Sequence, residues 1–170
     1  MTHPDRIYLV GLMGAGKSRV GTMIASVLAR PYLDNDVELV RVTGRTTLEW
    51  AAIGQIELHD AEANYALDVA ARSDSFIAGL AASVADRVEL ADPIHASGFV
   101  VYLRARPHTL AARVSSDPER PWLHDDPETV LTEMFAVRDD SLGALADFVV
   151  DTDDLRWAEV ADLIVKAAST

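Results

Sequence analysis

The 170-residue sequence contains no cysteine. This absence excludes disulfide bonds, thiolate metal sites and cysteine nucleophiles, and it leaves no sign of an oxidising compartment. The sequence also lacks a run of roughly 20 uninterrupted apolar residues, which a membrane-spanning helix requires. The first apolar run, from Ile7, is too short and too interrupted by glycine to act as a signal peptide. We therefore expect a cytoplasmic protein that does not associate with membranes.

Basic residues are scarce, because 15 Lys and Arg stand against 27 Asp and Glu, giving a formal net charge of −12. A surface of this charge repels the phosphate backbone of nucleic acid, so we do not expect nucleic acid as a partner. Hydrophobic residues make up 49% of the sequence, which is typical of globular proteins and not of disordered ones. The length fits one domain over residues 1–170, and we expect a monomer.

Short apolar runs alternate with patterns of helical spacing along the chain. The predicted strands cover residues 6–12, 32–33, 75–79, 99–103 and 148–151. The predicted helices cover residues 17–30, 36–42, a segment capped by Thr46 or Thr47, residues 55–72, 107–115 and 128–142, and a segment from about Asp154. This alternation predicts an α/β fold with a parallel five-stranded sheet and helices on both faces.

The segment Gly11–Ser18 reads GLMGAGKS and fits G-x-x-x-x-G-K-[ST] at every specified position, between a predicted strand and a predicted helix. Glycines let backbone N–H groups turn toward phosphate oxygens, and the helix N-terminus adds its dipole. The alternative is a glycine-rich turn that binds no phosphate. The motif predicts a site for ATP and Mg²⁺, with Lys17 on the β and γ phosphates. The predicted nucleotide-binding residues here are Gly11, Gly14, Ala15, Gly16, Lys17, Ser18 and Arg19.

Several further motifs, taken in order and spacing with this loop, resemble the shikimate kinase family over nearly the whole chain. These motifs are residues 32–36 (YLDND), 43–45 (TGR), Arg113, 120–123 (RPWL), Arg138 and 150–152 (VDT). The resemblance implies a single-domain P-loop kinase fold. It also implies transfer of the γ-phosphoryl group of ATP to a hydroxyl of shikimate or of a related cyclitol or polyol.

The resemblance assigns roles to two carboxylates that follow the second predicted strand. Asp34 lies beside Mg²⁺, which Ser18 also coordinates, and Asp36 acts as the base on the acceptor hydroxyl. Both roles suit a position at the carboxyl end of a parallel strand, where ligand crevices open. The sequence Asp-Asn-Asp is also a common way to begin a helix, so a purely capping role is the alternative.

Two arginines complete the implied nucleotide site. Arg120 lies in a proline-bracketed polar segment, and we expect residues 117–126 to form a lid that brings Arg120 to the transferring phosphoryl group. The alternative for Arg120 is a solvated surface charge. Arg113 resembles the family's arginine that stacks on adenine, with residues 153–156 closing the base site. Lys17, Asp36 and Arg120 are the predicted catalytic residues.

The implied acceptor site contains Asp36, His59 and Arg138. Arg138 matches the family's arginine that binds the substrate carboxylate, a bidentate role that suits a guanidinium. Its alternative is an ion pair with Asp139 or Glu133. His59 stands where the family has a second carboxylate-binding arginine, and its alternative is a packing or surface histidine.

The acceptor half departs from the family pattern at three places. Leu58-His59 replaces phenylalanine and arginine, Leu80-Ala81-Ala82 follows Gly79 where the family has consecutive glycines, and Leu142 replaces a tyrosine. We expect the side chains after Gly79 to fill space beside the substrate, and shikimate to be a poor acceptor. These departures leave open a catalytically impaired, nucleotide-binding regulatory protein of the same fold. A P-loop GTPase fits less well, because no Asn-Lys-x-Asp element is present.

Overall fold

The computed structural model describes residues 4–114 and 126–169. Its centre is a five-stranded sheet in the order β2-β3-β1-β4-β5, and every strand pair is parallel. The strands are β1 Arg6–Val10, β2 Tyr32–Leu33, β3 Phe76–Gly79, β4 Phe99–Arg104 and β5 Phe148–Asp151. Residues 7–10 of β1 are fully buried, as expected for the central strand of a sheet covered on both faces. The predicted fold class is confirmed.

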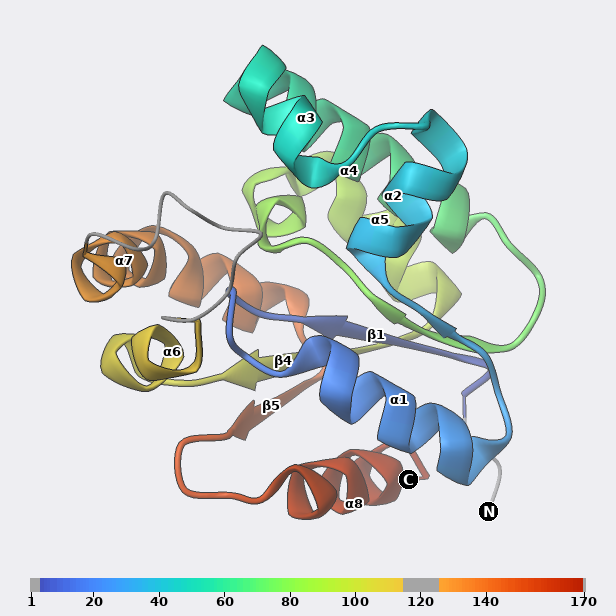
Figure 1. Cartoon of the computed structure of the whole chain (residues 1–170). Coiled ribbons are helices and arrows are strands. Elements are labelled where there is room, and N and C mark those ends of the chain that lie inside the picture. The colour runs from blue at the N-terminus through green and yellow to red at the C-terminus, as the bar shows by residue number, and fades with distance from the viewer. Residues whose placement is uncertain (1–3, 115–125, 170) are drawn as a thin grey trace.

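Helices cover both faces of the sheet, with α1 and α8 packed together on one face and α5 and α7 on the other (Figure 1). Helices α2, α3 and α4 form a group at one end of the molecule. The helices are α1 Lys17–Leu28, α2 Asn35–Thr43, α3 Thr47–Ile53, α4 Gln55–Ala70, the 3₁₀ helix η1 Ala82–Asp86, α5 Val88–Ser97, α6 Pro107–Val114, α7 Pro127–Leu145 and α8 Trp157–Ala167. Thr46 caps α3 in a capping box with Glu49, so of the two candidates, Thr46 and Thr47, the first is confirmed as the cap.

The segment from residue 80 to residue 98 contains η1 and α5, for which the sequence had predicted no element. Pro93 lies inside α5 and cannot donate a backbone hydrogen bond, so the local pattern argues against a helix. Leu90 and Ile94 are buried on one side of α5, and this burial outweighs the missing bond. Helix α8 begins at Trp157, three residues after the predicted start at Asp154.

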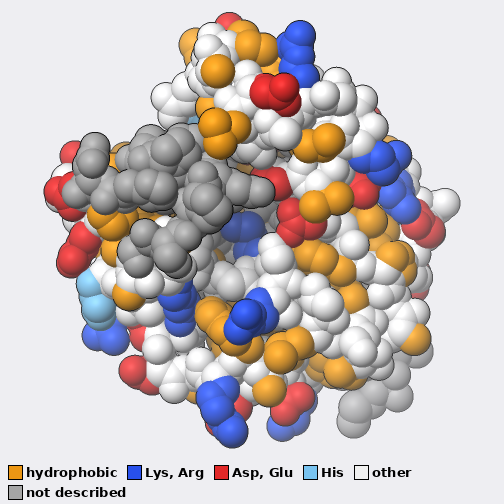
Figure 2. Space-filling view, viewed as in Figure 1, with side chains coloured by type: hydrophobic (Ala, Val, Ile, Leu, Met, Phe, Trp, Pro, Cys, Tyr) orange, Lys and Arg blue, Asp and Glu red, His pale blue; other side chains and the backbone are white. Residues whose placement is uncertain are grey.

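The expectation of one domain with a lid at residues 117–126 stays a prediction, because only Asp126 of that segment lies within the described residues. Its carboxylate accepts a bond from the Thr129 amide at 3.1 Å and caps α7. Acidic and basic side chains are interspersed with hydrophobic ones on the face in Figure 2. Within residues 4–114 and 126–169, no helix is both long and apolar enough to cross a bilayer.

Candidate active site

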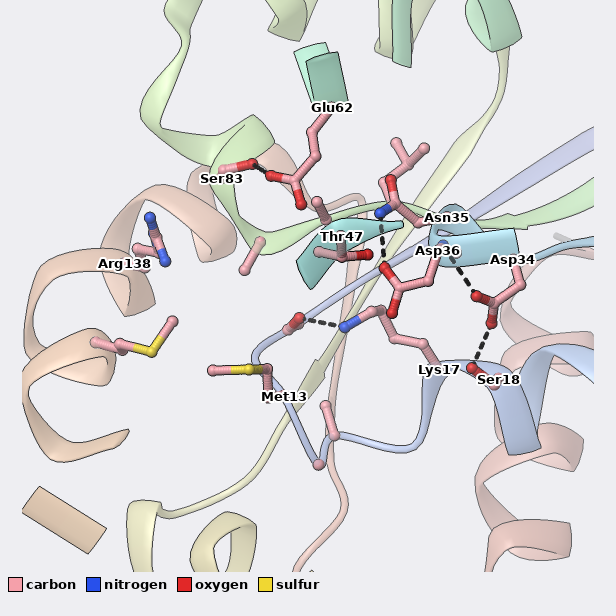
Figure 3. Close-up of a pocket in the computed structure, with 18 of the residues that line it drawn as sticks. Met13, Lys17, Ser18, Asp34, Asn35, Asp36, Thr47, Glu62, Ser83 and Arg138 are labelled. Carbon is pink, nitrogen blue, oxygen red and sulfur yellow. Dashed lines mark hydrogen bonds between the residues drawn. The ribbon is translucent and has the colours of Figure 1, made fainter. Parts of the chain in front are cut away.

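A cleft of about 1320 Å³ opens at the carboxyl ends of the strands (Figure 3). The structure brings together in this cleft every predicted site residue that it describes. On the nucleotide side these are Gly11, Gly14, Ala15, Gly16, Lys17, Ser18, Arg19 and Arg113. On the acceptor side they are Asp36, His59 and Arg138, and Asp34, predicted to lie beside Mg²⁺, also lines the cleft. Arg120 lies outside the described residues.

The loop between β1 and α1 requires glycine where it meets the helix. Gly16 has φ of 93°, in the left-handed region, and a Cβ there would lie 2.5 Å from the Trp157 ring. The Lys17 ammonium donates to the carbonyl oxygens of Gly11 at 2.6 Å and Leu12 at 3.3 Å. Its charge is therefore held against the same loop whose backbone would surround a phosphate chain.

The end of the loop meets the end of β2 through a side-chain hydrogen bond. The Ser18 hydroxyl donates to Asp34 Oδ2 at 2.5 Å, and the other Asp34 oxygen accepts from the Asp36 amide at 3.1 Å (Figure 3). Asp34 therefore caps α2, as the alternative reading expected, while also facing Ser18. The Asn35 side-chain amide donates to Asp36 Oδ1 at 3.1 Å, which orients the second carboxylate. Capping and a role in the cleft are compatible at these positions.

Tyr32 is a neighbour of this carboxylate that sequence reasoning did not single out. Its hydroxyl donates to Asp34 Oδ2 at 3.4 Å. Burial, together with the negative charge of Asp34, raises the pKa of Tyr32 well above its ordinary value, so the hydroxyl keeps its proton. The Asp34 carboxylate thus receives hydrogen bonds from three elements, α1, β2 and α2.

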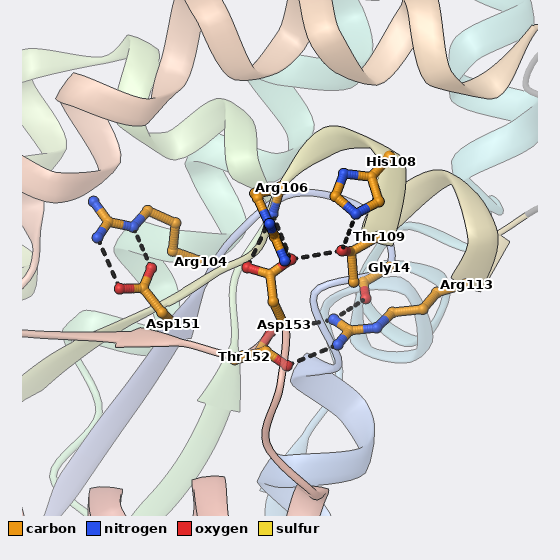
Figure 4. Close-up of polar contacts among 9 residues, drawn as sticks. All are labelled: Gly14, Arg104, Arg106, His108, Thr109, Arg113, Asp151, Thr152 and Asp153. Atoms are coloured by element: carbon orange, nitrogen blue, oxygen red, sulfur yellow. Dashed lines mark hydrogen bonds and ion pairs between the residues drawn. The ribbon is translucent and has the colours of Figure 1, made fainter.

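Arg113 lies at the other end of the nucleotide side, on α6. Its guanidinium donates to the Thr152 hydroxyl at 3.1 Å, the Thr152 carbonyl at 2.9 Å and the Gly14 carbonyl at 3.3 Å (Figure 4). The same guanidinium lies over the Trp157 ring, 4.5 Å from its centroid. Burial lowers the pKa of Arg113 from its very high ordinary value. Trp157 lines the cleft, and we had not predicted it.

The segment expected to close the base site is tied to the start of α6. Asp153 accepts a bond from the Thr109 hydroxyl at 2.5 Å and one from the Arg106 amide at 3.1 Å (Figure 4). Asp153 therefore fixes the turn before α8, whereas Trp157, the first residue of α8, lines the cleft. Trp157 is one of only 3 tryptophans in the chain, and this rarity was the feature of the sequence that could have marked it as a candidate site residue.

Arg138 forms a two-point ion pair with Asp86, the last residue of η1. Its Nη2 lies 2.6 Å from Asp86 Oδ2, and its Nε lies 3.1 Å from Oδ1 and 3.0 Å from Oδ2. An ion pair was the alternative reading of Arg138, but the partner is neither Asp139 nor Glu133. Asp139 instead accepts a bond from the Tyr102 hydroxyl at 2.9 Å. Arg138 is only 8% exposed and still lines the cleft.

A buried carboxyl group, Glu62, reaches the acceptor side from α4 and accepts a hydrogen bond from the Ser83 hydroxyl (Figure 3). Glu62 is 6% exposed, and burial, helped by the charge of Asp36, raises its pKa. His59, one turn earlier on α4, is half-buried. Burial and the positive charge of Arg138 lower the pKa of His59, so the imidazole is neutral at pH 7.

The residues after β3 that line the cleft include Leu80. Leu80 is also fully buried, and its amide donates to the Leu9 carbonyl at 2.9 Å, so it forms part of both the core and the cleft wall. Ala81 and Ala82 are partly exposed and line the cleft. Leu142 is likewise a fully buried core residue.

Comparisons with known proteins agree on one family. The family model for shikimate kinase matches residues 13–169. A shikimate kinase from Burkholderia lata is 37% identical over 86% of this chain and 80% of its own length, and one from Dechloromonas aromatica is 37% identical over 96% and 90%. The solved shikimate kinase of Acinetobacter baumannii, in complex with shikimate, superposes with a TM-score of 0.89 at 28% identity, covering 98% of this chain and 93% of the other.

Proposed function

Since the chain belongs to the shikimate kinase family, we propose that it transfers the γ-phosphoryl group of ATP to a hydroxyl of a small molecule, namely shikimate or a related cyclitol or polyol. The observation that carries this proposal is a single cleft lined by both the phosphate loop, with Lys17, and the Asp34–Asp36 pair. A phosphoryl donor and an acceptor hydroxyl can therefore lie side by side, as in-line transfer requires.

On the donor side, the chain's residues bind and neutralise phosphate. We assign the backbone amides of the phosphate loop to the β and γ phosphates, with the Lys17 ammonium as the cation that offsets charge growing during transfer. Arg113 and Trp157 form a flat surface next to Gly14 and Gly16, which suits the face of adenine. Arg120 remains the proposed second cation on the transferring group, as the sequence predicts.

Ser18 and Asp34 suit Mg²⁺ because they offer a hydroxyl and a carboxylate oxygen that already converge at 2.5 Å. Mg²⁺ is normally held by one or two protein oxygens together with phosphates and water, and a cage of protein carboxylates is not needed. Among the described residues, no group of three or more His, Cys, Asp or Glu side chains is arranged to hold a metal ion. The bound cation would supply positive charge to the phosphate oxygens.

On the acceptor side, Asp36 would receive the proton of the attacking hydroxyl. Its carboxylate is oriented by the Asn35 amide and lies beside Lys17 in the cleft (Figure 3). His59 and Arg138 line the part of the cleft that would contact the rest of the acceptor. Water exclusion would come from closure of the predicted lid over both substrates.

One observation favours the second candidate, a nucleotide-binding regulatory protein with impaired catalysis. Arg138, the residue expected to bind the acceptor, is engaged by Asp86. The two functions are separated by measuring ADP release from ATP and Mg²⁺ with a panel of shikimate, quinate and neutral cyclitols. The kinase requires acceptor-dependent ADP release by the wild type that Lys17→Ala abolishes. Nucleotide binding by calorimetry without acceptor-dependent release would favour the regulatory protein.

A further inference from the structure

We propose that Asp86 makes the acceptor site selective for uncharged hydroxyl compounds, because it binds one two-point edge of the Arg138 guanidinium and offsets the positive charge that an acceptor carboxylate would need. The inference rests on the proposed phosphoryl transfer and narrows its acceptor to a polyhydroxylated ring or chain without a carboxylate. Asp86 acts through Arg138, so it is a positioning residue and not a catalytic one.

Asp86 occupies one of the two edges through which the Arg138 guanidinium can bind a carboxylate at two points. Carboxylates bind arginine best through two parallel N–H bonds. Asp86 takes such an edge, formed by Nε and Nη2, at 3.0 Å and 2.6 Å to the same carboxylate oxygen, with a further contact from Nε to the other oxygen. The Arg138 side chain is 10% exposed and that of Asp86 is 32% exposed. An incoming carboxylate must therefore displace this charge-assisted pair, which water screens only weakly, or bind the other edge of a guanidinium whose charge Asp86 already offsets.

Asp86 is held in place by the residues before it in η1. Val84 is 2% exposed and packs in the core, while Ser83 is 4% exposed and donates its hydroxyl to Glu62. Helix η1 packs against α7, which carries Arg138. Because both anchors are buried, the backbone that carries Asp86 is held beside α7 and Arg138.

The charges around the acceptor site favour the same class of ligand. The positive charge of Arg138 is offset by Asp86, and the carboxyl groups of Asp36 and Glu62 line the same cleft. His59, at the remaining cationic position expected of the family, has a lowered pKa. Neither Arg138 nor His59 therefore offers an unopposed positive charge to an acceptor carboxylate, and carboxylate side chains repel it. Carboxylate oxygens instead accept hydrogen bonds from the hydroxyl groups of a neutral polyol.

The test compares shikimate with its neutral methyl ester, since the two differ chiefly in the carboxylate. Calorimetry in the presence of MgADP gives both affinities, and steady-state kinetics gives both kcat/KM values. The variants are Asp86→Asn, which keeps the shape but removes the charge, and Asp86→Ala as a second version should Asp86→Asn fold poorly. Asp60→Asn is the matched control, because Asp60 also pairs with an arginine, Arg87, but Arg87 does not line the cleft whereas Arg138 does.

We expect the wild type to bind methyl shikimate at least as tightly as shikimate. Asp86→Asn should raise the ratio of the affinity for shikimate to the affinity for its methyl ester by about 10- to 100-fold, the value of one charge-assisted contact. Asp60→Asn should leave this affinity ratio unchanged. Wild-type preference for shikimate by more than about tenfold, or an Asp86→Asn effect equal on both ligands, overturns the inference. The binding ratio decides this even without turnover, and absent turnover would instead contradict the proposed function.

Discussion

The Arg113 guanidinium lies 4.5 Å from the centroid of the Trp157 ring, and the same ring packs against Gly16 of the phosphate loop. This contact joins the start of α8 to the loop that would hold phosphates. A base that stacks on the Arg113–Trp157 pair would therefore be placed at a fixed distance from the phosphate site. The pair also provides a spectroscopic signal, since nucleotide binding should change the fluorescence of Trp157.

Replacing Trp157 tests this part of the nucleotide site. Trp157→Ala should raise the KM for ATP by about 5- to 100-fold, since stacking on an aromatic side chain contributes roughly 1–3 kcal/mol per base. Trp157→Phe should recover most of the loss. The control is Trp50→Ala, which removes another arginine–tryptophan contact, with Arg45, away from the cleft lining. Equal effects of Trp157→Ala and Trp50→Ala on the KM would contradict the assignment.

Lys17→Ala should remove catalysis with little loss of stability. We expect kcat to fall by about 10²- to 10³-fold or more, as when one preorganised charge-stabilising group is removed. The free energy of unfolding should change by only about 1 kcal/mol, because Lys17 donates to loop carbonyls and packs little core. Thermal unfolding and steady-state rates measure the two effects. Lys166→Ala, at the exposed end of α8, is the control and should retain full activity.

Neutralising Asp34 and neutralising Asp36 should change different kinetic properties of the enzyme. Asp34→Asn should raise the Mg²⁺ concentration for half-maximal activity by about 10- to 100-fold, because it weakens a metal-binding group. Asp36→Asn should lower kcat by about 10²- to 10⁴-fold, the usual value of a general base, with unchanged Mg²⁺ dependence. Magnesium titrations of both variants separate the roles, and chelation of Mg²⁺ should abolish wild-type turnover. Identical titration curves for the two variants would argue against this division.

Glu62→Gln should change the pH dependence of stability. Burial raises the pKa of Glu62 in the folded state above 4.5, so as the pH rises from 4.5 the unfolded state loses its proton first. Folding stability then falls until the pH passes the folded pKa. Glutamine avoids this loss and can keep the bond from Ser83.

The gain in unfolding free energy from Glu62→Gln should therefore be larger at pH 7 than at pH 4. Chemical denaturation at the two pH values measures it. The control is Glu57→Gln on the same helix, where the side chain is exposed. A Glu62→Gln effect that is the same at both pH values would contradict the account of the buried carboxyl group.

The features that the sequence predicted correctly depend on short stretches of chain. The phosphate loop is one continuous segment, and the Asp34 cap spans only the first turn of α2. The strands were recognisable because each is a short apolar run bounded by turn residues. Helix α5 was missed because Pro93 weakens the local helical pattern, and the burial of Ile94 that compensates depends on the tertiary fold.

The features that the sequence did not predict depend on residues far apart in the chain. Asp86 and Arg138 are separated by 52 positions, and Glu62 and Ser83 by 21. No periodicity or spacing indicates which of the 27 acidic residues pairs with a given arginine. The partner of Arg138 is set by η1, a short helix that packs against α4 and α7 and so depends on the tertiary fold for its position.

The most direct test of phosphoryl transfer is ³¹P nuclear magnetic resonance of ATP and Mg²⁺ with the wild-type protein, recorded with and without a neutral cyclitol or shikimate. We predict that the γ-phosphate signal is replaced by a phosphomonoester signal only when an acceptor is present, and that Lys17→Ala leaves ATP intact. Stable ATP with every acceptor, or inorganic phosphate released at the same rate with and without acceptor, would contradict the proposed kinase function.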